Sequence, residues 1–268
     1  MKKITFFSSL LVMIALWGCN PDAKKNNNGK IRLAFQPVKD KAVKINYSFS
    51  VNSVAANSVT NFYMVLSGKG ETASDGSVTL NVKNESIKMD GTIQGNNVSA
   101  VAGSTDTLTG DARLVSMPVF TLLGKTYRSS YDAGLNKKWE VQTDGDKVVD
   151  STENKMQLLV RYADQEVGVG DSWEKSLVIK AGNKMTCNAK YTLNEVKGDS
   201  AMISVEGKLY GKGESFGNEF TIDGTLKGTF TVDVTTGWPL ITNINQEFTL
   251  KLGERNIPMK YSIKSEVY

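Results

Sequence analysis

The chain has 268 residues, 40% of them hydrophobic, with 32 basic and 28 acidic side chains and a formal net charge of +4. Nucleic-acid-binding proteins usually carry a clustered basic face, so this near balance argues against that class. The sequence contains no histidine, which excludes Ser-His-Asp and Cys-His catalysis and every zinc site that needs histidine. We therefore expect no cofactor, no metal and no enzyme activity of these kinds.

Residues 1–18 have the pattern of a secretory signal peptide. Lys2 and Lys3 precede a mostly apolar run from Ile4 to Trp17. As a helix this run would reach roughly 21 Å at about 1.5 Å per residue. A bilayer span needs about 20 residues, so the run is too short to span a membrane and is typical of a cleaved signal.

The segment Leu16-Trp17-Gly18-Cys19 ends the apolar run and resembles the lipobox of bacterial lipoproteins, although Trp17 replaces the usual small or β-branched residue. The resemblance implies cleavage after Gly18 and acylation of Cys19, and two or more acyl chains anchor a protein stably. The polar, turn-rich residues 19–30 would then form a flexible tether. An ordinary secretory signal followed by an incidental cysteine is the alternative.

The same reading predicts where the protein is held. We expect a protein of the Gram-negative envelope that is bound to the membrane through the lipid on Cys19. The residues after Cys19 lack an acidic run of the kind that resembles a surface-export signal. This favours the periplasmic side of the outer membrane.

Lipidation of Cys19 would leave Cys187 as the single free thiol, so we expect no intramolecular disulfide. Around Cys187 the odd positions, including Met185 and Tyr191, are apolar or small and the even positions are polar. On a strand this pattern points the thiol inward. We interpret Cys187 as a core residue rather than a nucleophile.

From residue 31 onward, alternation of apolar and polar residues dominates the sequence. Ile31–Phe35 opens the series, Val43 to Val51 alternates cleanly, and Met259, Tyr261 and Ile263 alternate with polar residues near the end. Long strands joined by short turns predict a mainly β fold of antiparallel strands in curved sheets, as a sandwich or half-barrel, with one central helix. Residues 31–268 would form one domain, or two halves divided near residues 143–172.

The helix is predicted at residues 150–164. Met156, Val160 and Ala163 fall at helical spacing there, and Asp150 and Glu153 form a cap-like pair. Leu114–Leu123 is ambiguous, because its apolar pattern suits a helix but Pro118 interrupts it.

Two turn motifs accompany the lipobox. Val169-Gly170-Asp171-Ser172-Trp173 follows the predicted helix, and Gly228-Thr229 to Asp233 leads into Thr236-Gly237-Trp238-Pro239. Together these features resemble a family of β-rich bacterial envelope lipoproteins of unknown function. The resemblance covers roughly Ile31 to Tyr268 and implies a fold but no catalytic residues. Gly170 and Gly237 are expected to supply turn geometry, and Trp173 and Trp238 to anchor the core.

A modification signal is also suggested by Asp106-Thr107-Leu108, which resembles a short O-glycosylation sequence of exported Gram-negative proteins. The segments Asp150-Ser151-Thr152 and Asp199-Ser200-Ala201 have the same loose pattern. Thr107 is the best candidate because it lies in a polar, loop-like stretch.

Three functions remain open. The first is a non-catalytic binding or structural module, including a carrier of lipid or another apolar ligand in a sheet concavity. The second is a carboxylate-based glycan hydrolase, which needs paired carboxylates in one cleft. The third is a subunit of a larger envelope complex that binds another envelope protein.

We predict that Cys19→Ser abolishes incorporation of labelled palmitate, because the acyl chains have no other predicted attachment site. Metabolic labelling of cells that produce the parent chain and the variant is the measurement. Label that survives the substitution would show that Cys19 is not the lipidated residue.

Overall fold

The computed structural model describes residues 29–38, 41–53, 57–104, 108, 110–132, 137–144, 147–150, 160–181, 183–215 and 218–268. Cys19 and Thr107 therefore lie outside the described residues, and so do residues 151–159 of the predicted helix. No helix among the described residues is long and apolar enough to cross a membrane.

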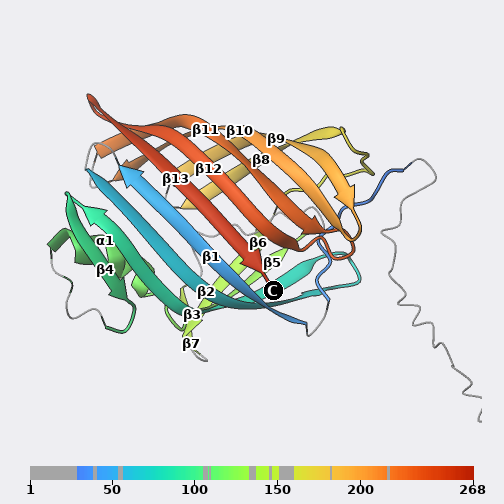
Figure 1. Ribbon diagram of the computed structural model, residues 1–268, viewed down its shortest axis with the longest axis horizontal. Helices are drawn as coiled ribbons and strands as arrows, with labels where there is room; N and C mark the ends of the chain where they lie inside the picture. Colours follow the sequence, from blue (N-terminus) through green and yellow to red (C-terminus); the bar gives the residue numbers. More distant parts are fainter. Residues whose placement is uncertain are drawn as a thin grey trace, which may run out of the picture.

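The described chain is built mainly of strands, with one short helix (Figure 1). In chain order the elements are β1 (Ala42–Ser53), β2 (Ser58–Thr72), β3 (Val78–Ile93), β4 (Asn96–Val101), α1 (Gly110–Phe120), β5 (Thr126–Tyr131), β6 (Lys137–Asp144), β7 (Lys147–Asp150), β8 (Ser172–Ala181), β9 (Asn183–Lys197), β10 (Ser200–Ser215), β11 (Asn218–Asp233), β12 (Pro239–Leu252) and β13 (Arg255–Val267). The predicted mainly β, antiparallel fold is confirmed.

All the strands belong to one 13-stranded sheet instead of several. Its order is β7-β6-β5-β3-β2-β1-β13-β12-β11-β10-β9-β8, and β4 pairs with β3 beside this path. Each described pairing is antiparallel, and the sheet is continuous because β1 pairs with β13 from Ile45↔Val267 to Ser53↔Met259. The path is not closed on itself, since its two ends are β7 and β8.

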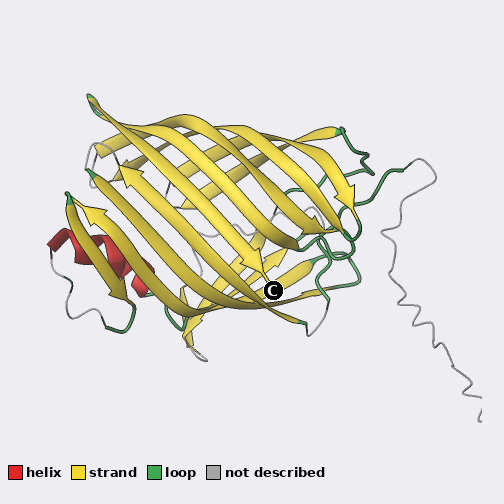
Figure 2. Cartoon of the chain, viewed as in Figure 1, coloured by secondary structure: helices red, strands yellow, loops and turns green. Residues whose placement is uncertain are grey.

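The sheet curls around its own inward-facing side chains, with β8–β11 across from β5 and β6 (Figure 1). Val78 of β3 and Tyr131 of β5 therefore share one core cluster with Tyr191 of β9 and Phe230 of β11. A second cluster forms where α1 covers the inward side of β1–β4, with Phe120 beside Phe62 and Met89. Figure 2 shows this helix beside β4 at one end of the sheet.

The position of the helix differs from the prediction. Asp150 ends strand β7, and residues 160–164 are not helical, so the helix predicted for residues 150–164 is wrong at both of its described ends. The helix α1 lies instead at Gly110–Phe120, overlapping the ambiguous apolar stretch, with Pro118 in its last turn. Packing against β3 and β4 favours a helix here despite the proline.

The sequence predicts a strand at Ile31–Phe35, but this segment forms only an isolated bridge between Ile31 and Val167. Its alternation is nevertheless used, because Ile31, Leu33 and Phe35 are each at most 4% exposed. The segment packs as extended chain inside the first core cluster. The alternation thus predicted correctly that one side of this segment is buried, but it predicted wrongly that the segment pairs in the sheet.

Glycines on the inward side of β10 and β11 allow the tight curvature. A Cβ on Gly228 would overlap the carbonyl oxygen of Asn243 and lie 2.6 Å from Cδ1 of Ile244. Gly207 is similar, with the carbonyl oxygen of Asn188 at 2.7 Å from a would-be Cβ. Bends of this kind commonly need glycine, because neighbouring backbone approaches too closely for a side chain.

We predict that Gly228→Ala destabilises the fold by about 1–3 kcal/mol, because the added methyl group has no space. Gly68→Ala in β2 is the matched control. Its Cβ would meet only ordinary contacts, the nearest at 3.6 Å to Val43. Denaturant midpoints measure both effects, and equal midpoints for the two variants would contradict the assignment of Gly228 to a tight bend.

Candidate functional site

The inward side of the sheet is fully buried near one end of the strands and only half buried toward the other. On β1, burial falls from Ile45 and Tyr47 to Phe49 and Val51. On β12 it falls from Ile244 to Phe248 and Leu250, and β13 carries Met259 and Tyr261 at the same level. We call the six residues Phe49, Val51, Phe248, Leu250, Met259 and Tyr261 the half-buried inner face.

These side chains are neighbours across three strands. Val51 pairs with Tyr261, and Phe248 pairs with Met259. The rings of Phe248 and Tyr261 stack with centroids 5.4 Å apart, and Phe49 stacks on buried Phe62 at 4.7 Å. The result is a contiguous apolar surface with flat aromatic faces, of the kind that lines sites for apolar ligands.

Side chains of the half-buried inner face are poorly solvated. Burial raises the pKa of the Tyr261 phenol above its usual value, although the side chain is only half buried. Desolvation disfavours the phenolate, so the hydroxyl stays protonated and can donate a hydrogen bond.

A separate pocket of about 260 Å³ lies under the Thr236-Gly237-Trp238-Pro239 turn. Trp238, Pro37 and Val43 form apolar walls, and Asp233 is the acid at its edge. One carboxylate oxygen of Asp233 accepts hydrogen bonds from the backbone N–H and the hydroxyl of Thr236 at 2.7 and 2.8 Å. Asp233 therefore stabilises the turn, and Trp238 packs on Phe35 with ring centroids 5.0 Å apart.

The Gly170-Asp171-Ser172-Trp173 motif is likewise structural. Asp171 accepts a hydrogen bond from Gly168 N–H at 2.9 Å and lies 3.4 Å from Lys30 Nζ. These contacts, the backbone bond first, lower the pKa of its carboxyl. Trp173 donates its indole N–H to the Arg161 carbonyl at 2.9 Å and stacks on Tyr191. The expectation that both motifs supply turns and core anchors is confirmed.

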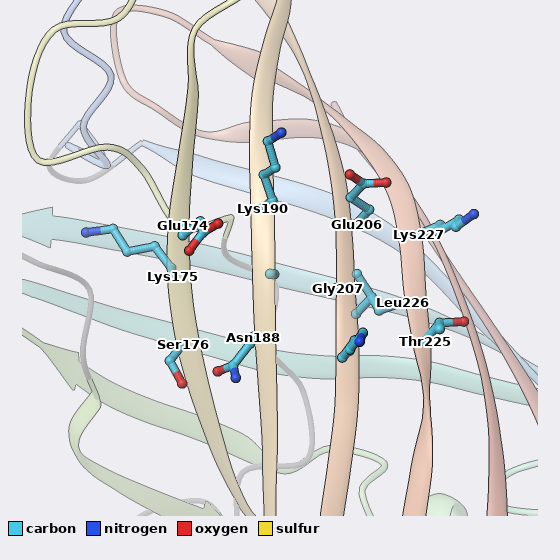
Figure 3. A pocket seen from close by; sticks show the side chains of 12 residues that line it. Glu174, Lys175, Ser176, Asn188, Lys190, Glu206, Gly207, Thr225, Leu226 and Lys227 are labelled. Carbon is cyan, nitrogen blue, oxygen red and sulfur yellow. The ribbon is translucent and has the colours of Figure 1, made fainter.

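An outward-facing hollow of about 530 Å³ lies over β8–β11 (Figure 3). Along one cross-strand row, Glu174 pairs with Lys190, Lys190 with Glu206, and Glu206 with Lys227. Opposite charges directly across a sheet attract modestly, and such alternating rows are typical of a solvated face. We assign this hollow to surface electrostatics and not to catalysis.

The predicted site residues have different outcomes. Lipidation of Cys19 and glycosylation of Thr107 stay predictions, because neither residue is described. Cys187 is confirmed as a core thiol, 1% exposed, and burial raises its pKa to about 11. Within the described ranges, no group of three or more acids or cysteines could hold a metal ion.

The half-buried inner face is the functional feature that sequence reasoning did not find. Alternation placed Phe49, Val51, Met259 and Tyr261 on the inward side correctly. It carried no signal that the packed clusters would cover these positions only in part, because that depends on where α1 and residues 160–167 fill the curl.

One comparison with known proteins is informative. Residues 139–239 match the model of a family of unknown function, DUF6263. The matched stretch includes both turn motifs and runs from β6 to the first residue of β12. No curated protein matches the sequence. The resemblance to a domain of unknown function is confirmed by this match, which supplies no activity.

We predict that the thiol of Cys187 reacts slowly with a disulfide reagent at pH 8 and rapidly after denaturation, because the reactive thiolate is suppressed. The raised pKa also adds stability below the unfolded thiol pKa of about 8.5, and this stability is lost as pH rises toward about 11. Cys187→Ala should remove this component of the alkaline loss. Rapid reaction of the native protein would contradict the assignment.

Proposed function

We propose that this chain is a lipid-anchored protein of the Gram-negative envelope that carries an apolar ligand without catalysing a reaction. The lipid on Cys19 would hold it at the outer membrane, facing the periplasm. The observation that carries the ligand proposal is the half-buried inner face, whose six apolar side chains adjoin fully buried residues on the same strands.

The half-buried inner face leaves apolar area exposed to water. Fully burying one large apolar side chain contributes about 1.5–3 kcal/mol, and a half-buried one leaves part of this gain unused. A chain-like apolar ligand laid across Phe49, Phe248 and Tyr261 would cover that area. The stacked rings offer flat contacts at little cost in side-chain entropy, since Phe and Tyr have few rotatable bonds.

The pKa shifts of the described carboxyl groups support a non-catalytic role. Glycan hydrolases need a general acid whose pKa is raised. Among the described carboxyl groups, those with shifted pKa values are Asp75, Glu85 and Asp171, and hydrogen bonds lower the pKa of each. None of the three is buried: Asp75 lies in the turn between β2 and β3, Glu85 lies on β3, and Asp171 directly precedes β8. They suit neither arrangement of paired catalytic carboxylates.

A second candidate function is that of a subunit in an envelope complex. A shallow outward trough of about 590 Å³ crosses β1, β2, β3, β12 and β13. Tyr63 and Ile241, which line it, are 45% and 42% exposed. Crosslinking in intact envelopes with a photoreactive residue at Tyr63 tests this role, and a specific protein adduct would support it.

We predict that the full chain carrying Cys19→Ser, purified without detergent, binds the fluorescent apolar probe N-phenylnaphthylamine on its half-buried inner face. Phe248→Glu should weaken this binding at least about tenfold, because it places an unpaired charge on the apolar surface. Fluorescence titration is the measurement.

Thr249→Glu is the matched control, because Thr249 is the next residue of β12 and points to the opposite side of the sheet. Circular dichroism establishes that both variants are folded. A parent chain that does not bind the probe would refute the carrier function. Equal binding by the two folded variants would place the probe elsewhere.

A further inference from the structure

Three polar side chains interrupt the apolar inward side at its buried end. Tyr47 of β1 pairs with Ser265 of β13, and Ser265 pairs with Thr242 of β12. Each of the three is 7% exposed. We call them the inner polar row.

The inner polar row adjoins the half-buried inner face. The next position on the same side of each strand, two residues along, is Phe49 after Tyr47, Ile263 after Ser265 and Ile244 after Thr242. A second step reaches Val51, Tyr261 and Gln246, which are all half buried. The rings of Tyr47 and Phe49 lie 6.1 Å apart. A chain lying on the half-buried inner face would therefore point one end at the polar row.

Two buried polar side chains on this side of the sheet have atoms without partners in the described structure. Thr242 Oγ1 is buried and has no partner there. Asn84, 1% exposed on the same side of the sheet, leaves both its amide oxygen and nitrogen without partners. Folded proteins rarely leave buried polar atoms unsatisfied, because the lost hydration is not replaced. A polar group beyond the described residues, such as one on a bound ligand, would satisfy Thr242.

The charge of the same side of the sheet limits which group fits. The described inward positions of β1–β3 and β9–β13 carry apolar residues, glycine and a few uncharged polar residues, apart from Arg255, which is exposed at the far end of β13 from Ser265. Glu140, which is buried on the same side of the sheet and accepts a hydrogen bond from Ser129, lies several strands away on β6. An ionised head group would lose its hydration there without meeting an opposite charge. Hydroxyls such as those of Thr242 and Tyr47 can both donate to and accept from an uncharged polar group.

We infer that the inner polar row binds the uncharged polar group of an amphiphilic ligand, while the ligand's chain covers the half-buried inner face. The ligand class is a long-chain alcohol or ester, in preference to an ionised fatty acid. This inference rests on the proposed carrier function and specifies its ligand.

The test uses displacement of N-phenylnaphthylamine from the full chain carrying Cys19→Ser at pH 8. Three competitors share one chain length: dodecanol, dodecanoate and dodecane. Dodecanol is expected to compete at least tenfold better than dodecanoate, which is ionised at this pH, and better than dodecane, which has no polar group.

Two conservative variants assign the preference to the row. Thr242→Val and Tyr47→Phe each remove one hydroxyl and keep the shape of the side chain. Each is expected to weaken dodecanol binding roughly three- to tenfold and to leave dodecane binding unchanged. Ser48→Ala is the control, since it removes a hydroxyl that faces the opposite side of β1.

Thermal melting of the ligand-free protein separates binding from a structural role. Thr242→Val removes a buried hydroxyl without a partner, so its melting temperature is expected to equal or exceed that of the parent. The inference is overturned if dodecanoate competes as well as dodecanol, or if both variants keep the parent's preference. If the probe does not bind the parent at all, the carrier function itself is refuted. Probe binding without a preference for dodecanol would refute only the inference about the inner polar row.

Discussion

The pairing of β1 with β13 is the constraint on which the rest of the structure depends. It joins the first and last strands from Ile45↔Val267 to Ser53↔Met259, and Lys44 and Tyr268 exchange two backbone hydrogen bonds of 3.0 Å. Without it the N-terminal and C-terminal strands would be two sheets with exposed edges. It also sets the inward side of β1 against β12 and β13, which creates both the half-buried inner face and the inner polar row. Such non-local pairing is slow to form, because long loops must close first.

The sequence predicts strands well here because one side of each strand is buried. Alternation alone predicts that Phe49 and Met259 face inward, and the packing of Phe49 on Phe62 and the partial burial of Met259 agree. The same reasoning failed at Ile31–Phe35, where the alternating residues enter the core without joining the sheet. It also placed the helix at residues 150–164, whereas the helix that forms is Gly110–Phe120. Helical spacing is a local signal, and tertiary packing decides which candidate segment is used.

The candidate site was only partly accessible to sequence reasoning. That most inward positions are apolar can be read from alternation once the strands are placed. The polar row cannot, because Tyr47, Thr242 and Ser265 become neighbours only through the registers of β1, β12 and β13. Single polar residues within apolar alternation look like interruptions in one strand. They are recognised as one polar row only when the strand registers place the three side chains next to one another.

The entry of the N-terminal segment has a mechanical consequence. Ile31, Leu33 and Phe35 are core residues, and the segment is tied to the turn before β12 by the bond from Gln36 N–H to the Thr236 carbonyl. The neighbouring Gly237 carbonyl accepts the hydroxyl of buried Tyr162. Tension applied to the chain ahead of Lys30 would therefore be resisted by packed side chains and not by a surface loop. Extracting this segment would remove part of the core, so a pull strong enough to release it would also loosen the curl that shapes the inner face.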